Sequence, residues 1–451
     1  MGARMWMICD QGGRILMKVV GSCLVFVSAL TVLLCLAPPG LARADGNAAA
    51  DSIGRYNPRG GFLLASTEQG TVNLRLFSYL RYLNSQRLEP TYTDAFGNTT
   101  VLDRRQDIHL NKVNIQLMGW VMDPKFRYLA YIWTSGTSQG QTSQVVVAGN
   151  LGYTFNPHVT VAGGVGSLPG VRTTEGSFPF WLSLDNRLIA DEFFRPSYTM
   201  GIWASGALVK RLQYHVMLGN NLSQFGVDAS QLDDGLNTWS ASLRWYPTTG
   251  EFGYRAGFGD FDRHEKVATR LGAHFTRSDE TSQGQPNTDA FENVQIRLSD
   301  GSVIFKPGLF GSGIQVREAT YQMASMDAGV KYRGFSLEGE YYWRRVDHLR
   351  GTGIEGLPVE AFHDDGFQVQ ASAMVKPQTV QLYTGASYVS GEYGDPWDFR
   401  LGVNWYPWKH QVMWWNFEYI HTDRSPVGAA SLPYLVGGTG EIFYTNFVLN
   451  F

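Results

Sequence analysis

Apolar and polar residues alternate along most of this chain, in segments of roughly ten residues. In TVNLRLFSYLRYL (71–83), Leu74 and Leu76 fall on one parity and Asn73 and Arg75 on the other. Successive side chains of a β-strand point to opposite faces, so this period of two predicts strands with one apolar and one polar face. The same alternation recurs at 112–119, 238–247, 334–345, 366–375 and 397–407.

The connections between these segments are alternately short and long. The short ones lie at 122–125, 155–158, 208–211, 331–334, 375–378 and 406–410, and the long ones at 84–106, 167–196, 221–236, 279–318, 346–363 and 423–439. Aromatic residues also gather where strands meet a turn, in RWYP (244–247) and NWYP (404–407). A soluble β-sandwich gives no reason for either feature, whereas both are typical of outer-membrane barrels. The sequence therefore predicts an all-β fold, a transmembrane antiparallel β-barrel with short periplasmic turns and long extracellular loops.

An even number of strands is expected if both ends of the barrel sequence lie on the periplasmic side. A first count gives seventeen, because FGYRAGFGD (252–260) resembles a strand, but the charged DRHEK that follows places it in an extended periplasmic turn, 248–267. The count is then about 16, and the last strand (441–451) closes the barrel against the first. We expect the terminal Phe451 to lie in the periplasmic girdle and to be read by the barrel-insertion machinery. A barrel of this size leaves an aqueous channel.

The first 44 residues read as a signal peptide. Met17-Lys18 begins an apolar stretch that ends in the small-x-small pattern Ala42-Arg43-Ala44, and Met17 is an alternative start. The competing interpretation is an uncleaved membrane anchor, since the apolar stretch is about long enough to span. Residues 45–70 are then a periplasmic segment and 71–451 the barrel, which places the protein in the bacterial outer membrane, in contact with its lipid.

Composition and motifs exclude several other classes. The formal net charge of −3 gives no reason to expect a nucleic-acid partner, and 14% aromatic residues with 51 glycines favour strands and turns. The three cysteines, Cys9, Cys23 and Cys35, all lie in the leader, so the rest offers no disulfide, zinc cluster or thiol chemistry. HExxH, GxSxG and CxxCH are absent. We expect no enzyme, no metal and no cofactor, although a Ser-His pair brought together in space stays open.

The long third loop, 167–196, is the expected constriction, because both signs of charge on an inserted loop sort solutes by charge and orientation. The alternative is a solvated loop closed by its own salt bridges. A second loop, 279–318, contains its own short alternation and is also expected to fold inward. The candidate constriction residues are Arg172, Glu175, Asp185, Arg187, Asp191 and Arg195.

Basic residues also recur at inward positions of the barrel wall, where they would line a path for solutes. The alternative is that they merely pair with inward carboxylates such as Glu338, Glu340 and Asp398. The candidate lining residues are Arg75, Arg81, Lys112, Arg127, Arg244, Arg344 and Arg400.

Several segments resemble the phosphate-selective porin O/P family of bacterial outer-membrane porins. HLNKVNIQLMGWVMDPKFRYLAYIW is similar to its second strand, DP turn and third strand, and PFWLSLDNRLIADEFFRPSYTMGIWASGAL to its third loop and next strand. The likeness extends diffusely from about residue 70 to the end. It implies a homotrimeric, sixteen-stranded porin with inward loops and phosphate transport. The mixed charges at inward positions depart from the family's basic ladder, and no individual phosphate-binding residue can be matched.

The function expected from pattern and resemblance is passive diffusion of small hydrophilic solutes through a water-filled channel, with anions such as phosphate among them. One alternative is a barrel sleeve that encloses a periplasmic partner, as a redox or secretion conduit. Another is a transporter of hydrophobic solutes, against which the Asn, Gln, Ser and Arg at inward positions argue. A porin conducts ions alone, whereas a sleeve does not conduct without its partner.

Overall fold

The computed structural model describes residues 53–57, 60–135, 144–223, 235–283, 296–428 and 433–451. The expected signal peptide and its cleavage site lie outside these residues, as does part of the expected inward loop, 284–295.

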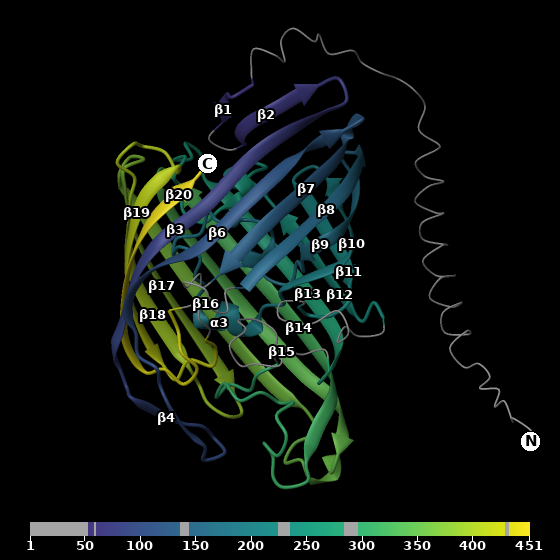
Figure 1. The fold of residues 1–451 in the computed structure, drawn as a ribbon, viewed down its shortest axis with the longest axis vertical. Helices are drawn as coiled ribbons and strands as arrows, with labels where there is room; N and C mark the ends of the chain where they lie inside the picture. Colours follow the sequence, from purple (N-terminus) through teal and green to yellow (C-terminus); the bar gives the residue numbers. More distant parts are fainter. Residues whose placement is uncertain (1–52, 58–59, 136–143, 224–234, 284–295, 429–432) are drawn as a thin grey trace, which may run out of the picture. The chain divides into compact units, whose positions relative to one another are not determined.

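Sixteen antiparallel strands form one closed barrel, which confirms the predicted fold class (Figure 1). Each strand pairs with its neighbours in sequence, and the last strand pairs with the first, with Asn450 opposite Phe77. The strands are β3 (Gly70–Leu88), β6 (Gln106–Val121), β7 (Asp123–Ser135), β8 (Gln144–Asn156), β9 (Val159–Ser167), β10 (Tyr198–Val209), β11 (Leu212–Gly219), β12 (Thr238–Trp245), β13 (Ala268–Thr281), β14 (Gln315–Tyr332), β15 (Phe335–Thr352), β16 (Phe362–Lys376), β17 (Val380–Gly391), β18 (Trp397–Trp405), β19 (Met413–Asp423) and β20 (Gly440–Asn450).

Other elements are short. β1 (Tyr56–Asn57) and β2 (Gly61–Thr67) fold back onto the start of β3, and β4 (Thr91–Thr93) pairs with β5 (Thr99–Val101) in the first long loop. The helical turns are η1 (Arg172–Thr174), α3 (Ile189–Phe194), η3 (Tyr254–Ala256) and η4 (Ile354–Gly356). In the described part of the chain, no helix is long and apolar enough to cross a membrane.

The barrel wall is apolar outside and polar inside, the reverse of a soluble protein. On β12, Leu243 is 46% exposed while its neighbour Ser242 is buried, as is Ser240. On β15, Leu337 is 51% exposed, whereas Glu338 is buried. Alternation of this kind around a closed sheet gives an outer surface suited to hydrocarbon and a lumen suited to water.

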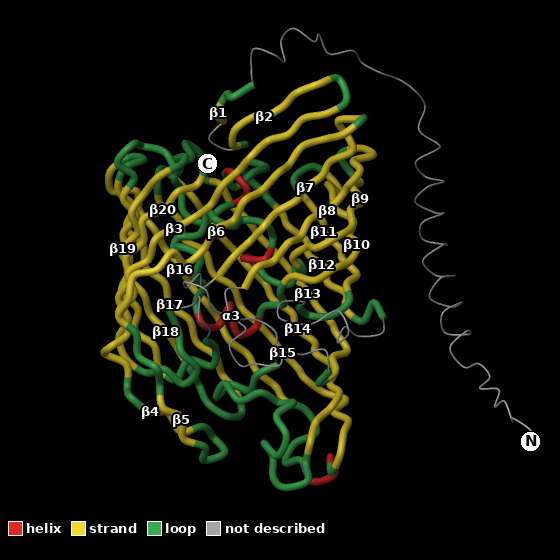
Figure 2. Tube along the Cα trace, viewed as in Figure 1, coloured by secondary structure: helices red, strands yellow, loops and turns green. Residues whose placement is uncertain are grey.

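The two ends of the barrel differ. β3 begins and β20 ends at the end with short turns, whereas the long connections gather at the other end (Figure 2). One connection at the short-turn end is an exception, because 246–267 separates β12 from β13 without forming a strand. This is the segment that the even strand count assigns to an extended turn.

Candidate functional site

The connection between β9 and β10, residues 168–197, folds into the barrel instead of standing outside it. We call it the inserted loop. Its Ser183 hydroxyl donates to Glu418 Oε2 at 2.7 Å, and its Leu184 carbonyl accepts from Arg81 Nη2 at 3.1 Å. Because Glu418 and Arg81 point inward from β19 and β3, the loop crosses the interior and is bonded to the opposite wall.

Apolar contacts hold the middle of the inserted loop. Phe194 of α3 stacks on Tyr342 of β15, with ring centroids 5.0 Å apart, and Ile189 is fully buried. The same buried cluster includes Ile296 and Leu298 from the loop between β13 and β14. The described parts of two loops and the wall thus share an apolar core inside the barrel, which blocks part of its cross-section.

Two candidate constriction residues at the start of the inserted loop are buried in ion pairs with the wall. Arg172 Nη2 lies 2.9 Å from Glu338 Oε2 on β15. Glu175 bonds Arg270 of β13 and lies 3.4 Å from Arg244 Nε on β12. Burial alone would raise the pKa of Glu175, but the charges of Arg270 and its neighbours outweigh it and lower that pKa. These residues anchor the loop and do not face the lumen.

Asp191 is fully buried in α3. It accepts a hydrogen bond from Thr173 Oγ1 at 3.0 Å, and its Oδ2 has no hydrogen-bond partner among the described residues. Burial, the largest cause, raises the pKa of Asp191 to about 7, against the opposing charge of Arg187. This candidate therefore lies beneath the lumen surface.

Three candidates do face open space. Asp185 accepts from Lys112 Nζ of β6 at 2.5 Å and from the Tyr79 hydroxyl of β3 at 2.6 Å. Arg187 and Arg195 both bond the carboxylate of Glu192, with Arg187 Nη1 at 3.2 Å from Oε2. Both signs of charge therefore lie on this face of the inserted loop.

The candidate lining residues divide in the same way. Arg81, Arg344 and Arg400 are buried, and Arg344 and Arg400 pair with Asp364 at 2.7 Å and Asp398 at 3.0 Å. These arginines hold the inserted and neighbouring loops, as do Arg172 and Glu175. Arg127 is exposed at the short-turn end of β7.

The long turn 246–267 enters the barrel from the short-turn end and meets the inserted loop. We call it the inserted turn. Tyr254 packs edge-on against Phe180, with ring centroids 5.1 Å apart, and the Phe258 amide donates to the Phe180 carbonyl at 2.7 Å. Within this turn, Asp260 Oδ1 accepts a hydrogen bond from His264 Nδ1 at 2.5 Å. That hydrogen bond is the main cause that raises the pKa of His264.

A cavity of 240 Å³ remains between the inserted loop, the inserted turn and the inner faces of β3 and β6 to β10. Its lining carries five basic and two acidic side chains, and aromatic rings from the wall and the loop face it as well. The basic residues are Arg75, Lys112, Arg187, Arg195 and Arg255, and the acidic residues are Asp185 and Glu192. The described residues hold no cluster of three side chains suited to a metal ion.

Arg255 is the basic lining residue that is absent from the candidates predicted from the sequence. It lies in a segment assigned to a turn outside the barrel, where a charged residue is ordinarily solvated. The available signal was the length of that turn together with its aromatic residues Phe252, Tyr254 and Phe258, which need an apolar surface to cover them.

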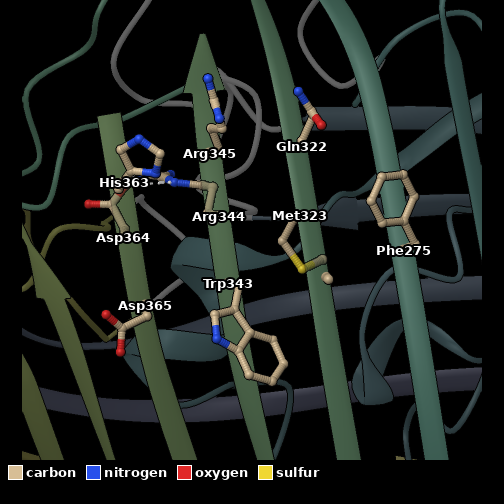
Figure 3. A pocket seen from close by; sticks show the side chains of 10 residues that line it. Phe275, Gln322, Met323, Trp343, Arg344, Arg345, His363, Asp364 and Asp365 are labelled. Carbon is tan, nitrogen blue, oxygen red and sulfur yellow. Dashed lines mark hydrogen bonds and ion pairs between the residues drawn. The ribbon is translucent and has the colours of Figure 1, made fainter. Parts of the chain in front are cut away.

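A second hollow, of 300 Å³, crosses the wall strands β13 to β16 (Figure 3). It is lined by outward side chains such as Trp343 and Arg345, and the Arg344–Asp364 ion pair neutralises the charge at its inner edge. Because it lies across the wall and not along the barrel axis, it offers no path through the protein.

No protein-family model and no curated protein matches this chain. Solved structures do resemble it. Outer-membrane expressed OmpT of Vibrio cholerae has a TM-score of 0.54 at 12% identity, over 86% of this chain and all of that one. An anion-selective porin from Comamonas acidovorans has a TM-score of 0.52 at 10% identity, over 85% of this chain and all of that one. The outer membrane channel DcaP of Acinetobacter baumannii has a TM-score of 0.50 at 10% identity, over 87% of this chain and all of that one. At these identities, the likeness establishes the barrel fold alone.

Proposed function

We propose that this chain is an outer-membrane porin, a water-filled channel for the passive diffusion of small hydrophilic solutes, with a preference for anions. The apolar outer wall supports insertion into lipid, and the end with short turns would face the periplasm. The solved structures that share the fold are outer-membrane proteins, and two of them are described as a porin and a channel.

The charge of the cavity carries the anion preference. Five basic side chains face the cavity against two acidic ones. Asp185 is paired with Lys112, and Glu192 is shared by two arginines, so positive charge remains where the passage is narrow. A positive potential in a confined passage lowers the barrier to anions and raises the barrier to cations. Phosphate, which the family resemblance implies, is one anion of this class.

The remaining parts of the proposal concern assembly and location. We infer export through a cleaved signal peptide, recognition of the last strand by the barrel-insertion machinery, and residence in the bacterial outer membrane. A homotrimer is proposed because the family resemblance implies one and because a trimer form of OmpT of Vibrio cholerae shares the fold, with a TM-score of 0.51. The apolar outer wall offers the surface on which such contacts would form.

A sleeve around a periplasmic partner receives no support from the interior of the barrel. A partner protein would have to occupy the space in which the inserted loop packs, where Ile189 and Ala190 are fully buried in a cluster with residues of the wall and of neighbouring loops. Expelling that loop would expose its apolar core and its buried ion pairs.

Conductance of the folded protein in a planar lipid bilayer tests the channel directly. We expect stepwise current increases in potassium chloride without any partner, and permeation of liposomes by small sugars. An intact, inserted barrel that passes neither ions nor sugars would contradict the proposal.

A further inference from the structure

Two arginines of the cavity have no acidic partner among the described residues. Arg75 points inward from β3, and Arg255 reaches the same cavity from the inserted turn. Every other basic residue of that lining bonds a carboxylate, namely Asp185 or Glu192. Because a guanidinium stays charged at any physiological pH, two like charges face one space without compensation.

The position of Arg255 comes at a conformational cost. Its φ is +51° and that of Ala256 is +46°, which is the left-handed region that residues with a Cβ rarely adopt. Desolvation inside the barrel, and then repulsion from Arg75, lower the pKa of Arg255. Arg255 is nevertheless exposed to the cavity. Two like charges that face one accessible space favour the binding of a group of opposite charge.

Aromatic rings cover the cavity next to these arginines. Trp133 of β7 and Phe178 of the inserted loop flank Lys112, whose Nζ lies 4.7 Å and 5.3 Å from their ring centroids. The guanidinium of Arg187 lies over the ring of Trp181, with its Cζ 4.3 Å from the ring centroid. The rings hold these cations against apolar surface. The lining therefore combines two positive charges that have no acidic partner among the described residues with partly exposed aromatic rings.

The size of the cavity limits the ligand. It holds 240 Å³ of free space. A one-ring organic acid fits this volume. Inorganic phosphate also fits, but it has no apolar surface to bury on Trp133, Phe178 and Trp181.

We propose that this cavity is a binding site for small aromatic carboxylates, with the carboxylate held by Arg75 and Arg255 and the ring packed against Trp181 and Trp133. The inference rests on the proposed channel function and names the class of solute that the channel selects. A guanidinium binds a carboxylate through two parallel hydrogen bonds, and aromatic faces bind a second ring in offset or edge-on packing. Release from such a site stays fast because the ligand keeps one side open to the passage.

Benzoate, acetate and inorganic phosphate serve as probes, each added to the full-length protein in a planar bilayer while chloride carries the current. We expect benzoate to reduce the current at a concentration roughly tenfold lower than acetate or phosphate, because only benzoate uses both the charge and the rings. Calorimetric titration of benzoate into the folded protein in detergent measures the same binding without current.

Two variants separate the charge from the ring. Arg255→Gln should raise the half-blocking concentration of benzoate roughly tenfold, since it removes one of the two guanidiniums that hold the carboxylate and leaves no carboxylate of the fold unpaired. Trp181→Leu should weaken benzoate block while leaving acetate block unchanged. Arg333→Gln, a charge-matched control in the exposed β14–β15 turn, should leave benzoate block as it is.

The outcomes separate this inference from the channel function. Equal block by benzoate and phosphate, or loss of block in Arg333→Gln to the same extent as in Arg255→Gln, overturns the aromatic carboxylate site and leaves the channel intact. Absence of any chloride current in the inserted protein overturns the channel and, with it, this inference.

Discussion

At the scale of single residues, the charges of the inserted loop fall into two groups. Those that touch the wall, such as Arg172 and Glu175, are buried in ion pairs, whereas Arg187 and Arg195 keep contact with open space. The first group stabilises the position of the loop and the second group sets the charge of the passage. Sequence spacing alone cannot distinguish them, because both groups lie within 172–195.

Removing one member of a buried pair should destabilise the loop. Arg172→Met leaves Glu338 charged and buried, and we expect the free energy of unfolding to fall by about 3–5 kcal/mol. The double variant Arg172→Met with Glu338→Leu should recover most of this loss, because no lone charge remains. Urea unfolding of the folded barrel in detergent measures both. A double variant as unstable as the single one would show that the pair contributes through something other than charge compensation.

Asp191 should make the stability of the barrel depend on pH. Its pKa of about 7 exceeds the value of about 3.9 in an unfolded chain, so the folded state holds an extra proton between these limits. The free energy of unfolding therefore falls as the pH rises from about 4 to about 7 and is level above that.

Urea unfolding at several pH values tests this sign. Asp191→Asn keeps the shape and cannot ionise, so it should flatten the decline between pH 4 and 7. Asp103→Asn, an exposed change in the first long loop, is the control. An unchanged slope in Asp191→Asn would contradict the assignment of that proton to Asp191.

At the scale of elements, the passage is narrowed from both ends of the barrel. The inserted loop enters from the end with long loops and the inserted turn from the end with short turns, and they meet at Phe180 and Tyr254. A turn of this length at the short-turn end is unnecessary for joining two antiparallel strands, which need only two residues.

Shortening the inserted turn should widen the passage. Replacement of 247–267 by Asn-Gly keeps β12 and β13 paired but removes Arg255 and the contact with Phe180. We expect a roughly twofold rise in single-channel conductance and a weaker anion preference. Lys409→Gln, an exposed change in the β18–β19 turn, should leave conductance unchanged. If the variant with the shortened turn has the same single-channel conductance as the parent protein, the inserted turn does not limit the ion current.

At the scale of the whole molecule, Phe451 takes part in the closure of the barrel beside the paired strands β20 and β3. The backbone of Phe451 exchanges two hydrogen bonds with Leu76 of β3, of 2.9 and 2.7 Å, and its ring lies 5.2 Å from that of Phe62. The terminal aromatic residue thus stands where the two ends of the sheet meet.

Deleting Phe451 should lower the yield of inserted barrel in cells by roughly tenfold, because both the closing contacts and the proposed insertion signal are lost. Phe451→Tyr, which keeps the ring, should insert normally. The inserted fraction is measured on gels, because a folded barrel migrates differently before and after heating. Normal insertion of the deletion variant would show that Phe451 is needed neither for closing the barrel nor as an insertion signal.

The sequence predicted the barrel well and the passage only in part. Alternation at Leu243 and Ser240 reports which face is which, since a strand has only two faces. It could not tell that Arg81 and Arg400 face inward yet are covered by the inserted loop, because that contact joins residues more than a hundred positions apart. Arg255 was missed for the same reason, since turns carry no periodic pattern that locates them in space.

The zero-current potential in a potassium chloride gradient tests whether the charge of the cavity makes the channel prefer anions. We expect a potential with the sign for chloride, reduced when Arg75 and Arg255 are both changed to Gln. A potential near zero, or one with the sign for potassium, would contradict it.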